Sequence, residues 1–142
     1  MNKKTLVFIL ISASLIANVV YAKVIFSCET TNNKNVLVKD FGDFIEYKFG
    51  KNLENPELEL KVPRDKASTR QWNGMTRNQV YRVNIPNKNI SYSVFRYFDS
   101  MAHSSGSGIY VIIDDKIAAT VDCIDDTTVA EIEGIDLKDS DW

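Results

Sequence analysis

The chain has few of the residues that metal and cofactor chemistry usually requires. Its 142 residues include 1 histidine, His103, and 2 cysteines, Cys28 and Cys123, which lie far apart in the sequence. Structural zinc sites take four ligands, usually cysteines and histidines in closely spaced pairs, and this chain has no such pair. We therefore expect neither a metal ion nor a cofactor.

A strong excess of basic residues is also absent. The chain has 17 basic and 19 acidic residues, for a net charge of -2. Binding to nucleic acid relies on a basic excess that neutralises phosphates, so we expect no nucleic-acid partner. The acidic residues gather in residues 124–142, which we treat as a tail behind a β domain of residues 23–123. We expect this tail to be mobile or to form a helical turn around Val129 to Ile132.

Catalytic motifs are missing as well. His103 lies among several serines, but catalysis by a nucleophile needs a base and an orienting group held rigidly beside it, and nothing here resembles a nucleophile elbow. The acidic pair Asp114-Asp115 is better interpreted as the tight turn of a hairpin, because aspartate tolerates the backbone angles required there. We expect that the protein is not an enzyme.

The first 22 residues have the layout of a cleavable secretory signal peptide. Two lysines precede a mainly apolar run from Leu6 to Val20, and Val20 and Ala22 have side chains small enough for signal peptidase. A membrane anchor is the weaker alternative, since the run of about 15 residues is short of the roughly 20 needed to span a bilayer. The sequence predicts a periplasmic or secreted protein with no stable membrane anchor after cleavage.

Two cysteines in an exported chain predict one disulfide. Cys28 lies in the first predicted strand and Cys123 in the last, so a bridge would tie the two ends of the β domain together. Lipid attachment at Cys28 is the alternative, but the bulky Phe26 lies where a small residue usually precedes a lipid-modified cysteine.

Apolar residues alternate with polar ones throughout the β domain, which is typical of strands with one buried face. The predicted strands cover Val24–Cys28, Val36–Val38, Phe44–Phe49, Glu57–Val62, Val80–Ile85, Ile90–Phe98, Ile109–Ile113 and Lys116–Cys123. About eight short strands with no convincing helix between them indicate an all-β fold, an antiparallel barrel or sandwich closed by one disulfide. Of the two, we favour the closed barrel.

Two polar segments, Pro63–Asn78 and Asp99–Gly108, are predicted to be surface loops. Trp, Tyr and Arg dominate the energetics of protein interfaces, and the first loop has an isolated tryptophan among arginines. The alternative for Trp72 is a plug over one barrel end, and the alternative for the Ser/Gly-rich second loop is a flexible connector. The candidate partner-binding residues are Tyr110, Ser105, Ser107, Trp72, Arg70 and Arg77.

This layout resembles the small periplasmic lysozyme inhibitors of Gram-negative bacteria, in which a Ser-Gly-x-x-Tyr loop enters the active-site cleft of the enzyme. Here Ser105-Gly106 precedes Tyr110 by one residue too many, and Ser107-Gly108 by one too few. The chain is also similar to short exported β proteins that confer immunity to toxins. Both resemblances imply a protein partner, a hydrolase or toxin, whose cleft is occluded. The alternative is a β-barrel carrier of a small ligand.

Overall fold

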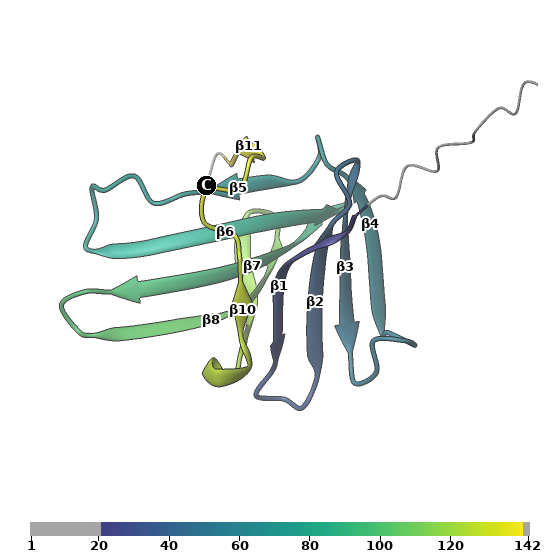
Figure 1. Ribbon diagram of the computed structural model, residues 1–142, viewed down its shortest axis with the longest axis horizontal. Coiled ribbons are helices and arrows are strands. Elements are labelled where there is room, and N and C mark those ends of the chain that lie inside the picture. Colours follow the sequence, from purple (N-terminus) through teal and green to yellow (C-terminus); the bar gives the residue numbers. More distant parts are fainter. Residues whose placement is uncertain (1–20, 141–142) are drawn as a thin grey trace, which may run out of the picture.

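The chain folds into two β-sheets, as a computed structural model that describes residues 21–140 shows (Figure 1). The first sheet contains β10 (Val129–Ala130), β1 (Lys23–Glu29), β2 (Asn35–Asp40), β3 (Phe44–Gly50) and β4 (Leu58–Pro63), in that order. The second contains β11 (Lys138–Asp139), β5 (Ser68–Arg70), β6 (Asn78–Asn87), β7 (Ile90–Asp99), β8 (Ser104–Ile113) and β9 (Lys116–Asp122). Apart from the 3-10 helix η1 (Asp125–Thr127), the regular structure is all β, as predicted.

Most of the predicted signal peptide lies outside the described residues, so its cleavage stays a prediction. Within residues 21–140, no helix has the length and apolar character needed to cross a membrane.

The first sheet follows the alternation of the sequence closely. Ile45 and Tyr47 of β3 are buried together with Val36 and Val38 of β2, while the residues between them are more exposed. The first strand departs from this pattern. Strict alternation with Phe26 and Cys28 predicts that Val24 points into the core, but a register shift between Val24 and Phe26 turns Ile25 inward instead and leaves Val24 36% exposed.

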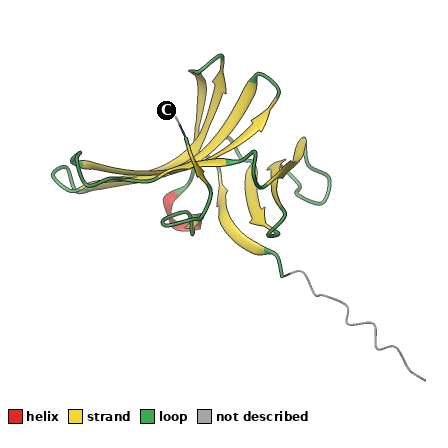
Figure 2. Cartoon of the chain, turned by 90° about the horizontal axis from the view of Figure 1, so that it is seen from above, coloured by secondary structure: helices red, strands yellow, loops and turns green. Residues whose placement is uncertain are grey.

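The second sheet is dominated by three strands of ten residues each, β6, β7 and β8. The β8 to β9 hairpin turns at Asp114 and Asp115, whose φ angles of 50° and 61° are those of the predicted tight turn. The three long strands extend beyond the first sheet. The first half of β6, the second half of β7 and the first half of β8 pair with one another and form a projecting arm (Figures 1 and 2). The segment that precedes β6 and the turn between β7 and β8 lie at the free end of this arm.

The two sheets pack as a sandwich, and the favoured closed barrel is wrong. In Figure 1 the strands of the first sheet run steeply across those of the second. Among residues 21–140, one isolated bridge, Thr30 to Cys123, joins the ends of β1 and β9, and no ladder of this part of the chain continues from it. Side chains from both sheets fill the space between them, including Phe26, Tyr47 and Ile85, each at most 1% exposed.

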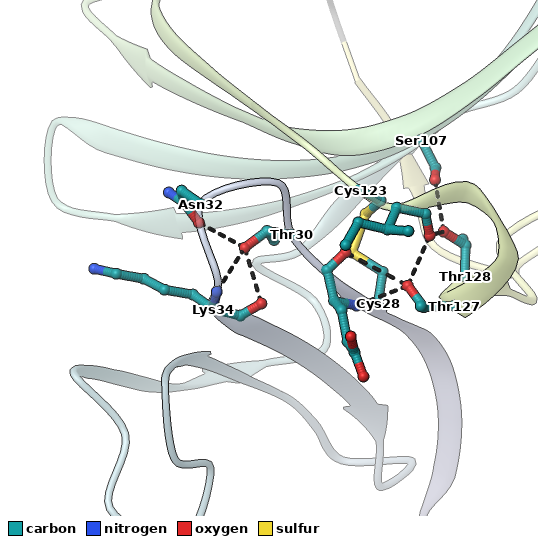
Figure 3. Close-up of a disulfide and its surroundings, with 10 residues drawn as sticks. Cys28, Thr30, Asn32, Lys34, Ser107, Cys123, Thr127 and Thr128 are labelled. Carbon is teal, nitrogen blue, oxygen red and sulfur yellow. Dashed lines mark hydrogen bonds between the residues drawn. A yellow bond between two sulfur atoms is a disulfide. The ribbon is translucent and has the colours of Figure 1, made fainter.

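The predicted disulfide between Cys28 and Cys123 is present at the junction of the two sheets (Figure 3). Both cysteines are buried, and the residues that follow them are held together as well. The Glu29 amide donates to Thr127 Oγ1 at 2.9 Å, and the Ile124 amide donates to the Glu29 carbonyl at 2.8 Å. The disulfide and these two hydrogen bonds therefore hold the first residues of the C-terminal segment against the end of β1.

The C-terminal segment is part of the fold through Ser140, and the expected helical turn around Val129 to Ile132 is wrong. Val129–Ala130 is strand β10, which pairs with β1, and the following Ile132 is 1% exposed. The Gln71 side chain holds this segment from the other sheet, since its Nε2 donates to the Ile132 carbonyl and its Oε1 accepts the Gly134 amide. Ile132, with the partly buried Ala130, Ile135 and Leu137, packs against the core and anchors this otherwise acidic segment.

Removing the disulfide is expected to lower the free energy of unfolding by about 4 to 5 kcal/mol, because the bridge spans 95 residues and restricts the unfolded chain. Urea unfolding of the oxidised protein, the reduced protein and the Cys28→Ala/Cys123→Ala variant would measure the change. The last two should unfold at the same midpoint, below that of the oxidised protein. Equal midpoints for all three would contradict the expectation.

Candidate functional site

The solvent-facing side of the second sheet carries aromatic rings that lie over glycines. Phe95 and Tyr97 of β7 point away from the first sheet, and their cross-strand partners on β8 are Gly108 and Gly106. A Cβ on Gly106 would lie 2.6 Å from Tyr97 Cε1, and a Cβ on Gly108 would collide with the Val121 carbonyl oxygen. Rings of this kind cover the exposed backbone of a strand glycine. The two glycines therefore make room for the rings.

The rings continue sideways into a row that crosses three strands. Phe95 stacks on Tyr97 with centroids 6.4 Å apart and on Tyr110 with centroids 4.1 Å apart. The guanidinium of Arg82 lies over the Tyr110 ring at 5.9 Å, within cation–π range. We call Tyr97, Phe95, Tyr110 and Arg82 the aromatic row. Phe95, between two rings, is 3% exposed, while the other three members of the row are half-buried.

Burial shifts the pKa values of two members of the row, Tyr110 and Arg82. Burial raises the pKa of Tyr110, and the nearby charge of Arg82 opposes this shift, so the Tyr110 hydroxyl is protonated at neutral pH. Burial also lowers the pKa of Arg82, as does the charge of Arg70. A guanidinium keeps its proton in proteins, so Arg82 presents a fixed positive charge at one end of the row.

A groove of about 690 Å³ adjoins the Arg82 end of the row. It lies over β5 and the start of β6, and Arg70 is the direct cross-strand partner of Arg82. The polar and aromatic side chains that line it include Arg70, Trp72, Asn73, Asn78, Arg82 and Asp139. We call this feature the arginine groove. The groove brings together two of the predicted binding residues, Arg70 and Trp72. Arg82 lines the same groove and also contacts the ring of a third, Tyr110.

The predicted Pro63–Asn78 loop is only partly a loop. It contains β5, whose Thr69 is 1% exposed, and the preceding Ala67 is fully buried. The remaining stretch is held by its own hydrogen bonds, since Trp72 Nε1 donates to the Thr76 carbonyl at 2.9 Å. Trp72 is 37% exposed and lines the groove, so it is a surface residue and not a plug over the core.

Arg77 has a structural partner within the chain. Its guanidinium bonds Asp99 Oδ2 at 2.7 and 3.1 Å, and Asp99 Oδ1 accepts the amides of Met101 and Ala102. The backbone bond from Ala102 and the bond from Arg77 hold the pKa of Asp99 below its usual range. This ion pair joins the loop before β6 to the turn after β7, and we call these two connected segments the tip of the arm. Met75 there is 85% exposed.

The predicted Ser/Gly loop is wrong from Ser104 onward, because this stretch is the beginning of β8. Ser105 and Ser107 alternate with Gly106 and Gly108, so they lie on the opposite face of the sheet from Tyr110. Ser107 is 6% exposed, and its hydroxyl bonds that of Thr128 at 2.9 Å (Figure 3). The two serines thus lie on the other face of the sheet from Tyr110, within a strand and not a loop.

Sequence reasoning missed Arg82, Phe95 and Tyr97. The alternation in β7 gives the signal, because Phe95 and Tyr97 have the opposite parity from Val94, which is buried between the sheets. Gly106 and Gly108 fall opposite them once β7 and β8 are paired. Glycine-rich composition alone predicts a loop, and only the cross-strand register shows that the glycines receive rings.

No protein-family model matches the chain, and no curated protein or solved structure matches it. Within residues 21–140, no three His, Cys, Asp or Glu side chains are grouped closely enough to bind a metal ion.

Replacing Gly108 with alanine is expected to lower the free energy of unfolding by about 1 to 3 kcal/mol, because the added methyl group overpacks against the Val121 carbonyl and the Phe95 ring. Thermal or urea unfolding measures the loss, and near-ultraviolet circular dichroism reports the disturbed rings. Ser105→Ala, at an exposed position of the same strand, is the matched control and should unfold like the wild type. A Gly108→Ala variant with wild-type stability would show that the rings do not need the glycine.

Proposed function

We propose that the protein is an exported inhibitor or immunity protein that binds and occludes a partner enzyme, a cell-wall hydrolase such as a lysozyme or a toxin. The observation that carries this proposal is the aromatic row beside the arginine groove on the solvent-facing side of a rigid sheet. Export rests on the predicted signal peptide, and the disulfide is compatible with an oxidising compartment.

The composition of this face supports binding to a protein. Energetic hot spots of protein interfaces are enriched in Trp, Tyr and Arg, and Trp72, Tyr110 and Arg82 lie together here. The stacked rings, and the Trp72 loop with its hydrogen bond from Trp72 to Thr76, are already ordered in the protein without a partner. Binding then loses little conformational entropy, which favours affinity.

The projecting arm supports occlusion of a cleft. Its tip carries Met75 and Met101, which are 85% and 72% exposed, and the Arg77 to Asp99 ion pair fixes the two loops that hold them. We propose that the tip enters the cleft of the enzyme while the aromatic row packs against the rim. Arg70 is then placed to pair with a carboxylate of the partner.

The carrier alternative gains no support from the fold. A carrier of this kind would need a barrel interior, and the two sheets form a sandwich. The space between them is filled by side chains such as Phe26 and Tyr47.

We expect Tyr110→Ala and Trp72→Ala each to weaken partner binding by about 2 kcal/mol, roughly thirtyfold, because each removes a large ring from the contact face. The partners to test are a panel of lysozymes and the product of the neighbouring gene, with affinity measured by calorimetry and inhibition by cell-wall lysis. Val129→Ala removes an exposed apolar side chain from β10 of the other sheet and should leave binding unchanged.

Two outcomes would count against the proposal in different ways. Wild-type affinity in both ring variants would show that another surface binds the partner. If the wild-type protein neither binds nor inhibits any enzyme of the panel, the proposed class of function is wrong.

A further inference from the structure

Two arginines face each other across neighbouring strands in the arginine groove. Arg70 and Arg82 are direct partners in the β5 to β6 ladder, and like charges placed directly opposite destabilise a sheet. Among the residues that the structure describes, Asp139 is the one acidic residue lining the groove, so two arginines face a single carboxylate there. An anionic group bound between the two guanidinium groups would offset their repulsion.

The remaining lining is suited to a sugar. Asn73 and Asn78 present amide groups, which both donate and accept hydrogen bonds as sugar hydroxyls require. Trp72 presents a partly exposed ring, and its N–H is already bonded to the Thr76 carbonyl. The ring orientation is therefore fixed, and the apolar C–H face of a pyranose has a flat surface on which to pack.

The groove is also held open in advance. Asn73 Oδ1 accepts the Met75 amide at 3.0 Å, and Thr76 Oγ1 donates to the Asn78 carbonyl at 2.8 Å. On the other side, the Ser140 amide donates to the Thr69 carbonyl at 2.8 Å and fixes the β11 wall. The volume of about 690 Å³ lies within the range of small-molecule sites, roughly 300 to 1,000 Å³.

We propose that the arginine groove is a binding site for a carboxylated saccharide, with the carboxylate between Arg70 and Arg82 and a pyranose ring against Trp72. The planar fork of arginine matches the two oxygens of a carboxylate. Asp139 and the net negative charge of the chain disfavour a polyphosphate or a nucleic acid. This site adds to the proposed function and does not depend on it, because the isolated protein should bind the sugar.

Tryptophan fluorescence provides a direct test, since the chain has only two tryptophans, Trp72 and Trp142. In a Trp142→Phe background, the remaining signal comes from Trp72. The probes are digalacturonate and N-acetylmuramic acid, which carry the carboxylate as a uronic acid and as a lactyl ether. The neutral controls are the dimethyl ester of digalacturonate, in which both carboxylates are esterified, and N-acetylglucosamine.

We expect at least one of the two acids to change the Trp72 fluorescence with a dissociation constant between about 10 µM and 1 mM, and the one that binds identifies the source of the carboxylate. Its neutral counterpart should bind at least about tenfold more weakly, since it lacks the charge. Arg70→Gln and Arg82→Gln should each weaken binding of the acid by a similar factor. Arg96→Gln is the matched control, because it removes the same charge from the opposite face of the sheet.

The inference would be overturned if neither acid binds, if acid and neutral probes bind equally, or if Arg96→Gln weakens binding as much as Arg70→Gln does. A tetraglutamate peptide that binds as tightly as the sugars would assign the groove to acidic protein segments instead. Each result is independent of partner inhibition, so a failed sugar titration in a protein that still inhibits its enzyme would reject this inference alone.

Discussion

The contact between the rings of β7 and the glycines of β8 is the constraint on which the rest of the candidate face depends. Phe95 lies flat on the sheet because Gly108 has no side chain, and only in this position can it stack on Tyr110. Tyr110 in turn lies beneath the guanidinium of Arg82. The solvent-facing side of the sheet thereby holds one buried ring, Phe95, among half-buried side chains.

The arm that carries this face is supported from both ends of the chain. The disulfide joins β1 to the end of β9, and the C-terminal segment then returns along β1 as β10 and along β5 as β11. Gln71, next to Trp72 in sequence, binds this segment at Ile132 and Gly134. The position of the tryptophan loop is therefore fixed by the same contacts that complete the sandwich.

Much of the fold could be predicted from local patterns. Alternation located the long strands, and turn chemistry located hairpins such as the one at Asp114 and Asp115, because both signals depend only on neighbouring residues. The choice of a sandwich over a barrel could not be made locally. It depends on which strands pair far apart in sequence, and the Cys28 to Cys123 bridge brings its strands together only at their ends.

The candidate site, like the fold, could be predicted only where it depends on residue type and local pattern, and not where it depends on strand pairing. Trp72, Arg70 and Tyr110 were identified by residue type, and they do lie near one another through Arg82. Ser105 and Ser107 were misplaced because a Ser/Gly-rich stretch is usually a loop, and only the register with β7 shows otherwise. Arg82 was missed because a single arginine in an alternating strand has the pattern of any solvated face.

Hydroxyl-radical footprinting of the protein in complex with the enzyme partner proposed for it tests the central claim most directly, because aromatic side chains are readily oxidised when exposed. The account predicts that oxidation of Trp72 and Tyr110 falls in the complex while that of Phe41, in the β2 to β3 turn of the other sheet, is unchanged. Protection of Phe41 with unchanged oxidation of Trp72 and Tyr110 would contradict it.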